Sequence, residues 1–183
     1  MKKFLLIFFA IPLCASAQND SSSLHMQQLF SANKKGMLVL GTWAIGNIGT
    51  GAIGMNTSSG VDKRFYEMNL FWNTVNLALA VPGRISAVRQ LRKIKEGNWV
   101  PTAEEFRKEQ RKTERLFLIN TGLDIVYLGT GFYMNKKART SGNPDLVKGY
   151  GNSLVLQAGF LFGFDAIMLL IHRSSGRKSA LFF

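Results

Sequence analysis

The sequence GMLVLGTWAIGNIGTGAIGMNTSSGV, which occupies residues 36–61, contains no charged residue. Three further stretches, at 65–83, 116–134 and 149–171, are mainly apolar and contain a single charged residue each. A helix needs roughly 20 mainly apolar residues to cross the hydrocarbon core of a bilayer. The sequence therefore predicts an all-α fold, a bundle of four transmembrane helices that span about 37–55, 65–83, 116–134 and 149–171.

The formal net charge of +12 at pH 7 comes from Lys and Arg residues that lie mainly between these stretches. Amphipathic helices of soluble proteins carry charges every few positions, so this segregation favours a membrane protein although the mean hydropathy is only +0.05. A nucleic-acid-binding domain can be equally basic, but it has no need for four such apolar helices. We expect the lipid bilayer as a partner and no nucleic acid.

The first 17 residues have the three parts of a secretory signal peptide. Lys2 and Lys3 precede an apolar core, and Ala15-Ser16-Ala17 forms a cleavage site of small residues. Cleavage there removes Cys14, the one cysteine, so we expect no disulfide in the mature chain. A short polar segment, 18–36, follows. The expected location is the inner (cytoplasmic) membrane of a bacterium, as a multi-pass protein.

The basic connection between the second and third spans, residues 84–115, is expected to form two helices that break at 97–101. The second span is expected to end at Pro82-Gly83, and the helix after it to lie at the headgroup level as an amphipathic helix. Thr102 and Glu105 fit a capping box that opens the next helix. The connection is interpreted either as a solvated linker or as a platform for an anionic lipid or protein partner.

Two features of the sequence predict opposite orientations of the bundle in the membrane. The side that carries the connection and the basic tail, 173–183, holds most of the Lys and Arg residues. The positive-inside rule places this side in the cytoplasm, whereas a cleaved signal peptide places it outside. We favour the signal peptide, because its three-part pattern is the more specific of the two.

A weak internal repeat indicates two repeated helix pairs. Gly49-Thr50-Gly51 in the first span recurs as Gly129-Thr130-Gly131 in the third. Tyr66 and Asn73 in the second span align with Tyr150 and Gln157 in the fourth. Both halves would run through the membrane in the same sense, as in parallel transporter repeats.

Small residues on two spans favour close helix packing. The string from Gly49 to Gly54 also fits the G-x-G-x-x-G of a dinucleotide loop, but it lacks the strand before it and the acidic residue after it that this motif requires. Packing is therefore the preferred interpretation, either within the chain or, for the fourth span, with a second copy as a homodimer. The predicted packing residues are Thr42, Gly46, Thr50 and Gly54 on the first span, with Gly159 and Gly163 on the fourth.

Polar residues recur on one face of each span, which predicts a polar core between the helices. Counting inward at ~1.5 Å per residue from the side of the basic connection brings Asn76, Asp124 and Asp165 to one layer, roughly 10–12 Å below the surface, with Asn47 slightly deeper. The complete candidate set is Asn47, Asn69, Asn73, Asn76, Asn120, Asp124, Tyr127, Gln157 and Asp165.

Three functions could use these carboxyl groups. The first is a structural hydrogen-bond network, in a membrane component that is structural or binds a partner. The second is a proton- or cation-coupled transporter or channel, because acidic residues within membranes mark ion paths. The third is an intramembrane aspartyl protease, for which the Gly-x-Gly-Asp pattern is absent at Asp124 and Asp165. We favour the first and do not expect an enzyme.

Other site chemistry is not expected. His25 and His172 are the two histidines, and the mature chain would have no cysteine, so neither a zinc site nor a haem site is predicted. No Ser/His/Asp arrangement with an oxyanion loop is visible. We therefore assign no catalytic residue, no metal and no cofactor.

Several segments resemble an uncharacterised bacterial family that is known only as a domain of unknown function. The segments are Leu40-Gly41-Thr42-Trp43-Ala44-Ile45-Gly46-Asn47-Ile48, Met68-Asn69, Trp72-Asn73, Val75-Asn76-Leu77, Gly149-Tyr150-Gly151, Gln157 and Phe164-Asp165. The resemblance covers residues 35–171. It implies a small multi-pass membrane protein and carries over no activity.

Overall fold

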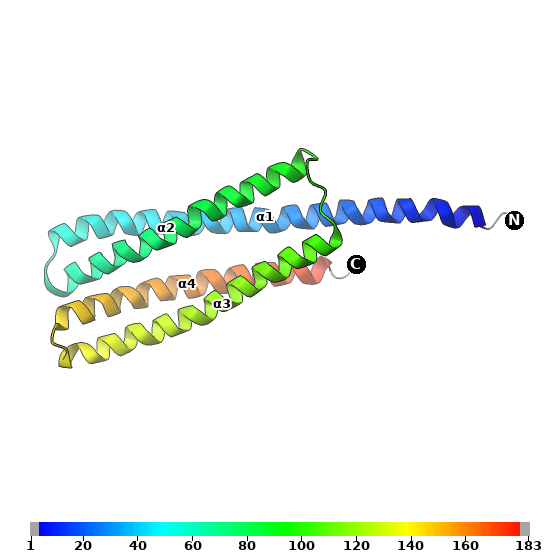
Figure 1. Cartoon of the computed structure of the whole chain (residues 1–183). Coiled ribbons are helices and arrows are strands. Elements are labelled where there is room, and N and C mark those ends of the chain that lie inside the picture. Colours follow the sequence, from blue (N-terminus) through cyan, green and yellow to red (C-terminus); the bar gives the residue numbers. More distant parts are fainter. Residues whose placement is uncertain (1–3, 180–183) are drawn as a thin grey trace.

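The computed structural model describes the backbone of residues 4–179 and the side chains of residues 21–176. It contains four long helices and one short 3₁₀ turn, and the all-α prediction is confirmed because no strand occurs among residues 4–179 (Figure 1). The elements are α1 (Phe4–Thr57), α2 (Gly60–Lys95), α3 (Ala103–Lys137), η1 (Ala138–Thr140) and α4 (Pro144–Ser179).

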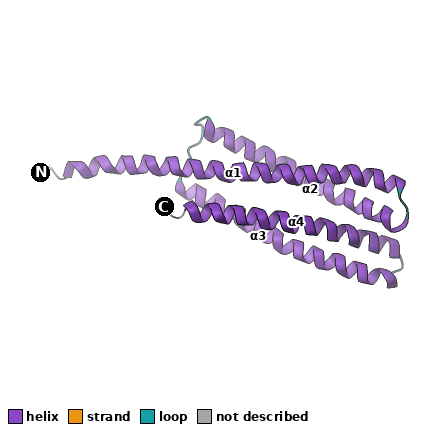
Figure 2. Ribbon diagram, turned by 180° about the vertical axis from the view of Figure 1, so that it is seen from behind, coloured by secondary structure: helices purple, strands orange, loops and turns teal. Residues whose placement is uncertain are grey.

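The four helices form two antiparallel hairpins, α1 with α2 and α3 with α4, and α2 also packs on α4. The backbones of α2 and α3 do not approach each other anywhere in the described chain. Figures 1 and 2 show both hairpin turns at one end of the bundle. The segment that joins α2 to α3 and the C-terminal end of α4 lie at the other end.

Each hairpin has a close helix crossing at the same position of the sequence repeat. A Cβ atom added at Gly51 would lie 2.9 Å from the Cβ of Leu70 on α2. A Cβ atom added at Gly131 would lie 2.7 Å from Val155 and 3.0 Å from the carbonyl oxygen of Gly151, both on α4. These two residues are the last glycines of the repeated Gly-Thr-Gly triplets, so the repeat matches an equivalent packing contact in the two hairpins.

Local signals define the helix starts. Thr102 and Glu105 make the predicted capping box, in which the Thr102 hydroxyl accepts from Glu105 N at 3.2 Å and the Glu105 carboxylate accepts from Thr102 N at 2.8 Å. These bonds lower the pKa of Glu105 below its usual value. At the other end, Asn143 Oδ1 accepts from Leu146 N at 3.2 Å, and Pro144 occupies the first turn of α4.

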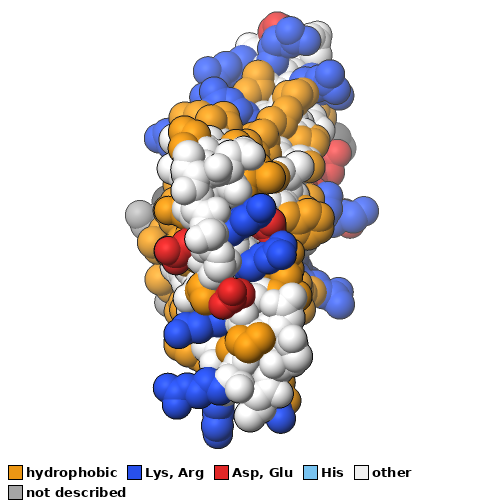
Figure 3. All heavy atoms as spheres, turned by 90° about the vertical axis from the view of Figure 1, so that its left-hand side faces the viewer, with side chains coloured by type: hydrophobic (Ala, Val, Ile, Leu, Met, Phe, Trp, Pro, Cys, Tyr) orange, Lys and Arg blue, Asp and Glu red, His pale blue; other side chains and the backbone are white. Residues whose placement is uncertain are grey.

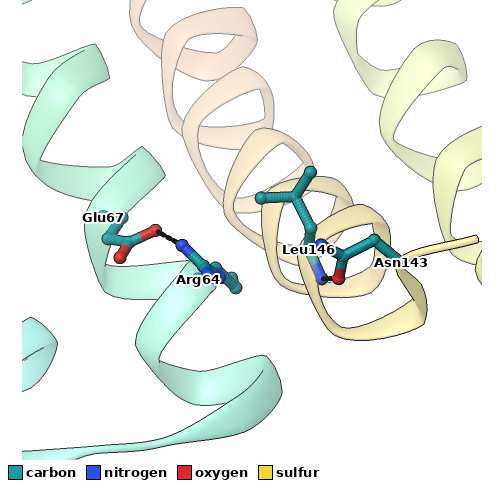
Figure 4. Close-up of polar contacts among 4 residues, drawn as sticks. All are labelled: Arg64, Glu67, Asn143 and Leu146. Atoms are coloured by element: carbon teal, nitrogen blue, oxygen red, sulfur yellow. Dashed lines mark hydrogen bonds and ion pairs between the residues drawn. The ribbon is translucent and has the colours of Figure 1, made fainter.

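Figure 4 shows this Asn143 cap near an ion pair on α2, in which Arg64 Nη1 donates to Glu67 Oε2 at 2.8 Å. The Glu67 carboxylate raises the pKa of Arg64 above its usual value. The pair lies just before the uncharged residues 68–83 of α2. A charged cluster therefore precedes the apolar part of α2 at the hairpin-turn end.

The prediction that the second helix ends at Pro82-Gly83 is wrong, because α2 continues through both residues to Lys95. The buried apolar face of α2 continues across the proline, from Ala80 before it to Ala87 and Leu91 after it. Packing on α1 outweighs the loss of one backbone hydrogen bond at an exposed proline. The amphipathic segment after Gly83 is therefore the end of α2, not a separate helix that lies at the headgroup level.

The predicted break at 97–101 is correct, and the segment before α3 packs against the N-terminal half of α1. A hydrophobic cluster joins α1, α2 and α3 at this end of the bundle. Its members are Met26, Leu29, Phe30, Leu91, Ile94, Trp99 and Phe106. Residues 21–36 of the expected polar N-terminal segment are thus part of the continuous helix α1. The signal-peptide prediction falls on residues 1–17, whose side chains lie outside the described part.

Along residues 68–83 of α2 the side-chain distribution is inverted relative to a soluble protein, with amides inside and large apolar residues outside. The buried asparagines of α2 are 0–4% exposed, whereas Phe71 and Leu79 on the opposite face of the same helix are each 62% exposed. By length and composition, three helices could cross a membrane, and these lie within Ser21–Thr57, Ala103–Thr140 and Pro144–Gly176. Figure 3 shows Lys and Arg side chains around the hairpin-turn end of the bundle.

Candidate functional site

The predicted polar residues lie inside the bundle. Six of the nine are buried, namely Asn69, Asn73, Asn76, Asp124, Gln157 and Asp165. The remaining three, Asn47, Asn120 and Tyr127, are half-buried. All four long helices contribute, because the inward-facing positions recur at helical spacing.

An amide network ties three helices together. Gln157 of α4 accepts a hydrogen bond from Trp43 Nε1 of α1 at 3.0 Å and donates one to the side-chain oxygen of Asn69 on α2. Asn69 Nδ2 donates to the carbonyl oxygen of Asn47 on α1 at 3.2 Å. Asn69 and Gln157 therefore connect the first hairpin to α4. Trp43, whose ring also stacks on Phe160 at 4.0 Å, was not recognised from the sequence as a member of this core.

The network continues along α2. Asn73 Nδ2 donates to the carbonyl oxygen of Asn69 at 2.8 Å, and Asn76 Nδ2 lies 3.4 Å from Asn73 Oδ1. Each amide thus has a neighbour of complementary polarity in a water-poor interior, as buried polar groups require. The amides of α2 lead towards the carboxyl groups on the other hairpin.

Two carboxyl groups meet between α3 and α4. Asp124 is 3% exposed and Asp165 is 5% exposed, and their side chains are close enough to interact. Asn120 is also close enough to interact with Asp165. Oδ2 of Asp124 has no hydrogen-bond partner among the described side chains. Because two neighbouring carboxylates repel each other and both are buried, we expect that the two groups are not both ionised.

A groove of about 650 Å³ lies between α2 and α3, where the two backbones stay apart. Asn76, Asn120, Asp124 and Asp165 line it, and so does Tyr127. Asn76, Asp124 and Asp165, which the sequence predicted to lie in one layer, therefore line the same groove. Its remaining lining is apolar and aromatic: Met37, Leu40, Phe71, Trp72, Val75, Leu79, Gly83, Leu116, Phe117, Leu123, Leu161 and Phe164.

Aromatic contacts frame this groove. Trp72 of α2 and Tyr127 of α3 meet edge to face, with ring centroids 5.0 Å apart and an interplanar angle of 83°. Phe117 of α3 and Phe164 of α4 make a similar contact with centroids 6.3 Å apart. The apolar rim residues Phe71 and Leu79 are strongly exposed, so the groove opens sideways from the bundle.

Most of the predicted packing residues face outward in the single chain. A Cβ atom at Gly46 would meet nothing within 4 Å, and Thr42 and Thr50 are exposed. Gly54 does pack, against the Tyr66 ring. The buried face of α1 instead carries Ala44, which is two residues from Gly46 and so lies roughly 200° away around the axis. Only Gly54 of the predicted first-span ridge therefore contacts another helix of this chain.

Gly159 and Gly163 also have open space at their Cβ positions. They line a second groove, of about 1050 Å³, between α1 and α4. Small residues of α1, including Ala32 and Gly36, line the opposite side. Its described lining is mainly apolar, includes Gln28 and Lys35, and contains no carboxyl group.

His172 was not predicted to belong to the core, yet it is fully buried near the C-terminal end of α4. Its ring stacks on Phe117 at 5.5 Å, and neither ring nitrogen has a hydrogen-bond partner within the described region. Gln110 of α3 donates to the His172 carbonyl oxygen and, at 2.7 Å, to Glu114. These contacts join α3 to α4 beyond the carboxyl pair. No group of three potential metal ligands occurs among the residues whose side chains the structure describes.

The fold and the polar core together define a helical bundle in which three helices are long and apolar enough to cross a membrane. The chain belongs to a family of unknown function, DUF6992, whose model matches residues 39–166. The match includes every residue of the polar core and of the Asp124–Asp165 pair. No curated protein and no solved structure matches the chain.

Proposed function

We propose that the protein is a four-span integral membrane protein of a bacterial inner membrane. In this proposal α2 crosses the membrane in addition to α1, α3 and α4. The three buried asparagines lower the hydropathy of α2, but they face the other helices. Its exposed face, with Phe71, Val75 and Leu79, is as apolar as the faces of the other spans. Uncharged residues 68–83 lie between the Arg64–Glu67 pair and Arg84, and modest thinning or tilt accommodates this length.

The proposed activity is binding rather than catalysis: the bundle holds a ligand or partner segment that lies in the bilayer. The observation that carries this proposal is the groove between α2 and α3, which is apolar at its rim and has carboxyl and amide groups at its base. Sites of this kind, largely apolar with a few converging polar groups, are typical of ligand pockets. The amide network between α1, α2 and α4 supports the role by holding the groove walls in place.

A second candidate function is proton- or cation-coupled transport, and the contact between Asp124 and Asp165 favours it. Buried acidic groups within a membrane mark proton and ion paths. We rank this candidate second, because four helices leave little room for a continuous path. A homodimer through the Gly159 and Gly163 face would provide more room.

The basic ends of α2 and α3 form the proposed contact with anionic lipid headgroups or a protein partner. Exposed Ile85 and Val88 adjoin Arg89, Arg92 and Lys93 where α2 leaves its uncharged stretch. Apolar and basic residues side by side suit the interface between acyl chains and phosphates. This contact would anchor the bundle and does not require the groove.

Fluorescence quenching by brominated acyl chains tests whether the groove is open to the bilayer. We would retain Trp72, replace Trp43 and Trp99 with Phe, and reconstitute the protein in lipid with brominated chains. Strong quenching of Trp72 is expected, and a variant that retains only Trp99, which packs at the connection end, should be quenched much less. Filling the groove with Leu123→Phe should reduce the quenching of Trp72. Equal, weak quenching of Trp72 and Trp99 would overturn the proposal.

A further inference from the structure

We propose that the groove between α2 and α3 binds a lipophilic cation, meaning a positively charged centre that carries bulky apolar groups. This inference rests on the proposed binding function and specifies the chemistry of the ligand. It follows from three independent properties of the groove: its charge, its aromatic walls and its opening.

The titratable groups of the groove favour a cation. Asp124 and Asp165 line it, and none of its lining residues in the described part of the chain is Lys, Arg or His. The Asp124 side chain is only 3% exposed, and its Oδ2 lacks a hydrogen-bond partner within the described region. A carboxylate charge in an apolar setting is costly, and a cation in the groove would lower that cost through its opposite charge, although Oδ2 itself is closed off from the groove. A monovalent cation beside the pair would favour the ionised form of one carboxyl group.

The walls suit a large cation better than a metal ion. A bound metal ion usually has three or more His, Cys, Asp or Glu ligands, and no such group occurs among the described residues. The rings of Trp72, Tyr127, Phe117 and Phe164 line the groove together with the carboxyl groups. Aromatic faces attract organic cations, most strongly where water is excluded. The aromatic lining therefore selects a cation with a diffuse charge.

The opening of the groove provides for the apolar groups. Phe71, Val75 and Leu79 of α2 stand on one rim and Leu116 and Leu123 of α3 on the other, each 45–62% exposed. A ligand with its charge at the carboxyl pair would place its apolar groups between these side chains. The volume of about 650 Å³ falls within the range of roughly 300–1,000 Å³ that small-molecule sites occupy.

Tetraphenylphosphonium and tetraphenylborate provide a matched pair of probes, because they have nearly the same shape and opposite charges. Binding to the full chain in nanodiscs would be measured by equilibrium dialysis, with empty nanodiscs as the blank. We expect saturable binding of tetraphenylphosphonium and none of tetraphenylborate. The double variant Asp124→Asn, Asp165→Asn should weaken binding roughly tenfold or more, and the exposed control Asp62→Asn should leave it unchanged.

The outcomes separate this inference from the proposed function. Equal binding of both probes, or full binding by a folded double Asn variant, would overturn the choice of a cation. Absence of tetraphenylphosphonium binding, with Trp72 still quenched by brominated lipid, would overturn it and leave the open groove intact. A basic transmembrane peptide that binds at Asp124 while tetraphenylphosphonium does not would replace the small cation with a protein segment. If the double Asn variant does not fold, Leu123→Phe replaces it in the test, because this change fills the groove and keeps both carboxyl groups. Leu123→Phe should abolish saturable binding. Undiminished binding by this variant would overturn the inference.

Discussion

Gln157 on α4 donates a hydrogen bond to the side-chain oxygen of Asn69 on α2, and this contact links the two helical hairpins. Gln157 also accepts from Trp43 at 3.0 Å, so one side chain connects three helices. Both partners are almost completely shielded, with Gln157 0% and Asn69 2% exposed. A hydrogen bond in such a setting fixes the relative position of the helices because the alternative is an unpaired polar group.

Replacing Gln157 with Leu should therefore destabilise the bundle. The change preserves bulk but leaves Trp43 Nε1 and Asn69 Oδ1 without their partner, and each unsatisfied buried group costs about 1–3 kcal/mol. Unfolding in mild detergent, followed by circular dichroism, would measure the loss. The neighbouring exposed Leu156 provides the control, since Leu156→Ala should have little effect. An unchanged unfolding midpoint for Gln157→Leu would show that the network does not hold the hairpins.

Each Gly-Thr-Gly triplet contains one glycine that contacts another helix and one that faces open space, so the two can be compared by mutation. Gly51→Ala and Gly131→Ala should each cost about 1–3 kcal/mol, because the new Cβ would meet Leu70 or Val155 at less than 3.0 Å. Gly49→Ala and Gly129→Ala should be neutral or slightly stabilising, because both positions face open space. The same unfolding measurement applies. If all four variants behaved alike, close approach at these crossings would not be the reason for the small residues.

Thr102→Ala should weaken the start of α3 by about 1 kcal/mol. The control is Ser59→Ala, because Ser59 occupies the same position before α2 but makes no side-chain capping bond. The pKa of Glu105 is lowered in the folded chain, so its stabilising contribution is present above the usual glutamate value and is lost as the pH falls through the lowered one. Helix content at pH 7 and in acid should show this loss in the parent and a smaller one in Thr102→Ala. A parent and variant with the same acid response would contradict the capping role.

The two candidate functions differ in the effect of Asp124→Asn on ion movement. In a binding protein the variant should fold normally, and vesicles that contain the parent protein should show no flux driven by a pH gradient. In a transporter the parent should carry such a flux and Asp124→Asn should abolish it. A pH-sensitive dye inside the vesicles provides the measurement. Flux in the parent that is lost in the variant would reverse our ranking.

Local patterns in the sequence predicted much of the architecture. The apolar stretches, the break at 97–101 and the capping box depend on neighbouring residues, and the inward polar face of α2 follows from helical spacing. The continuation of α2 past Pro82 could not be read locally, because it depends on packing against residues 21–36 of α1. The four-residue ridge of small residues was misleading for a similar reason: the face that α1 buries is set by α2 and α4, and it includes Gly51 rather than Gly46.

The candidate site was only partly predictable. Helical spacing placed Asn76, Asp124 and Asp165 at one depth, which requires only the helix rise. The groove itself arises because α2 and α3 stay apart while both contact α4, and no pattern in the sequence specifies which helices pair. Trp43 and His172 were missed because a single aromatic residue in an apolar stretch gives no periodic signal of a polar partner.

The central claim is that α2 crosses the membrane and brings its asparagines into the polar core. Single cysteines at Ser59, Asn98 and Gly142, in a chain with Cys14→Ser, can be labelled in sealed vesicles with a maleimide that does not cross membranes. We expect Ser59→Cys and Gly142→Cys to be labelled from one side and Asn98→Cys from the other. Labelling of Ser59→Cys and Asn98→Cys from the same side would contradict the account, because α2 would then not span the bilayer.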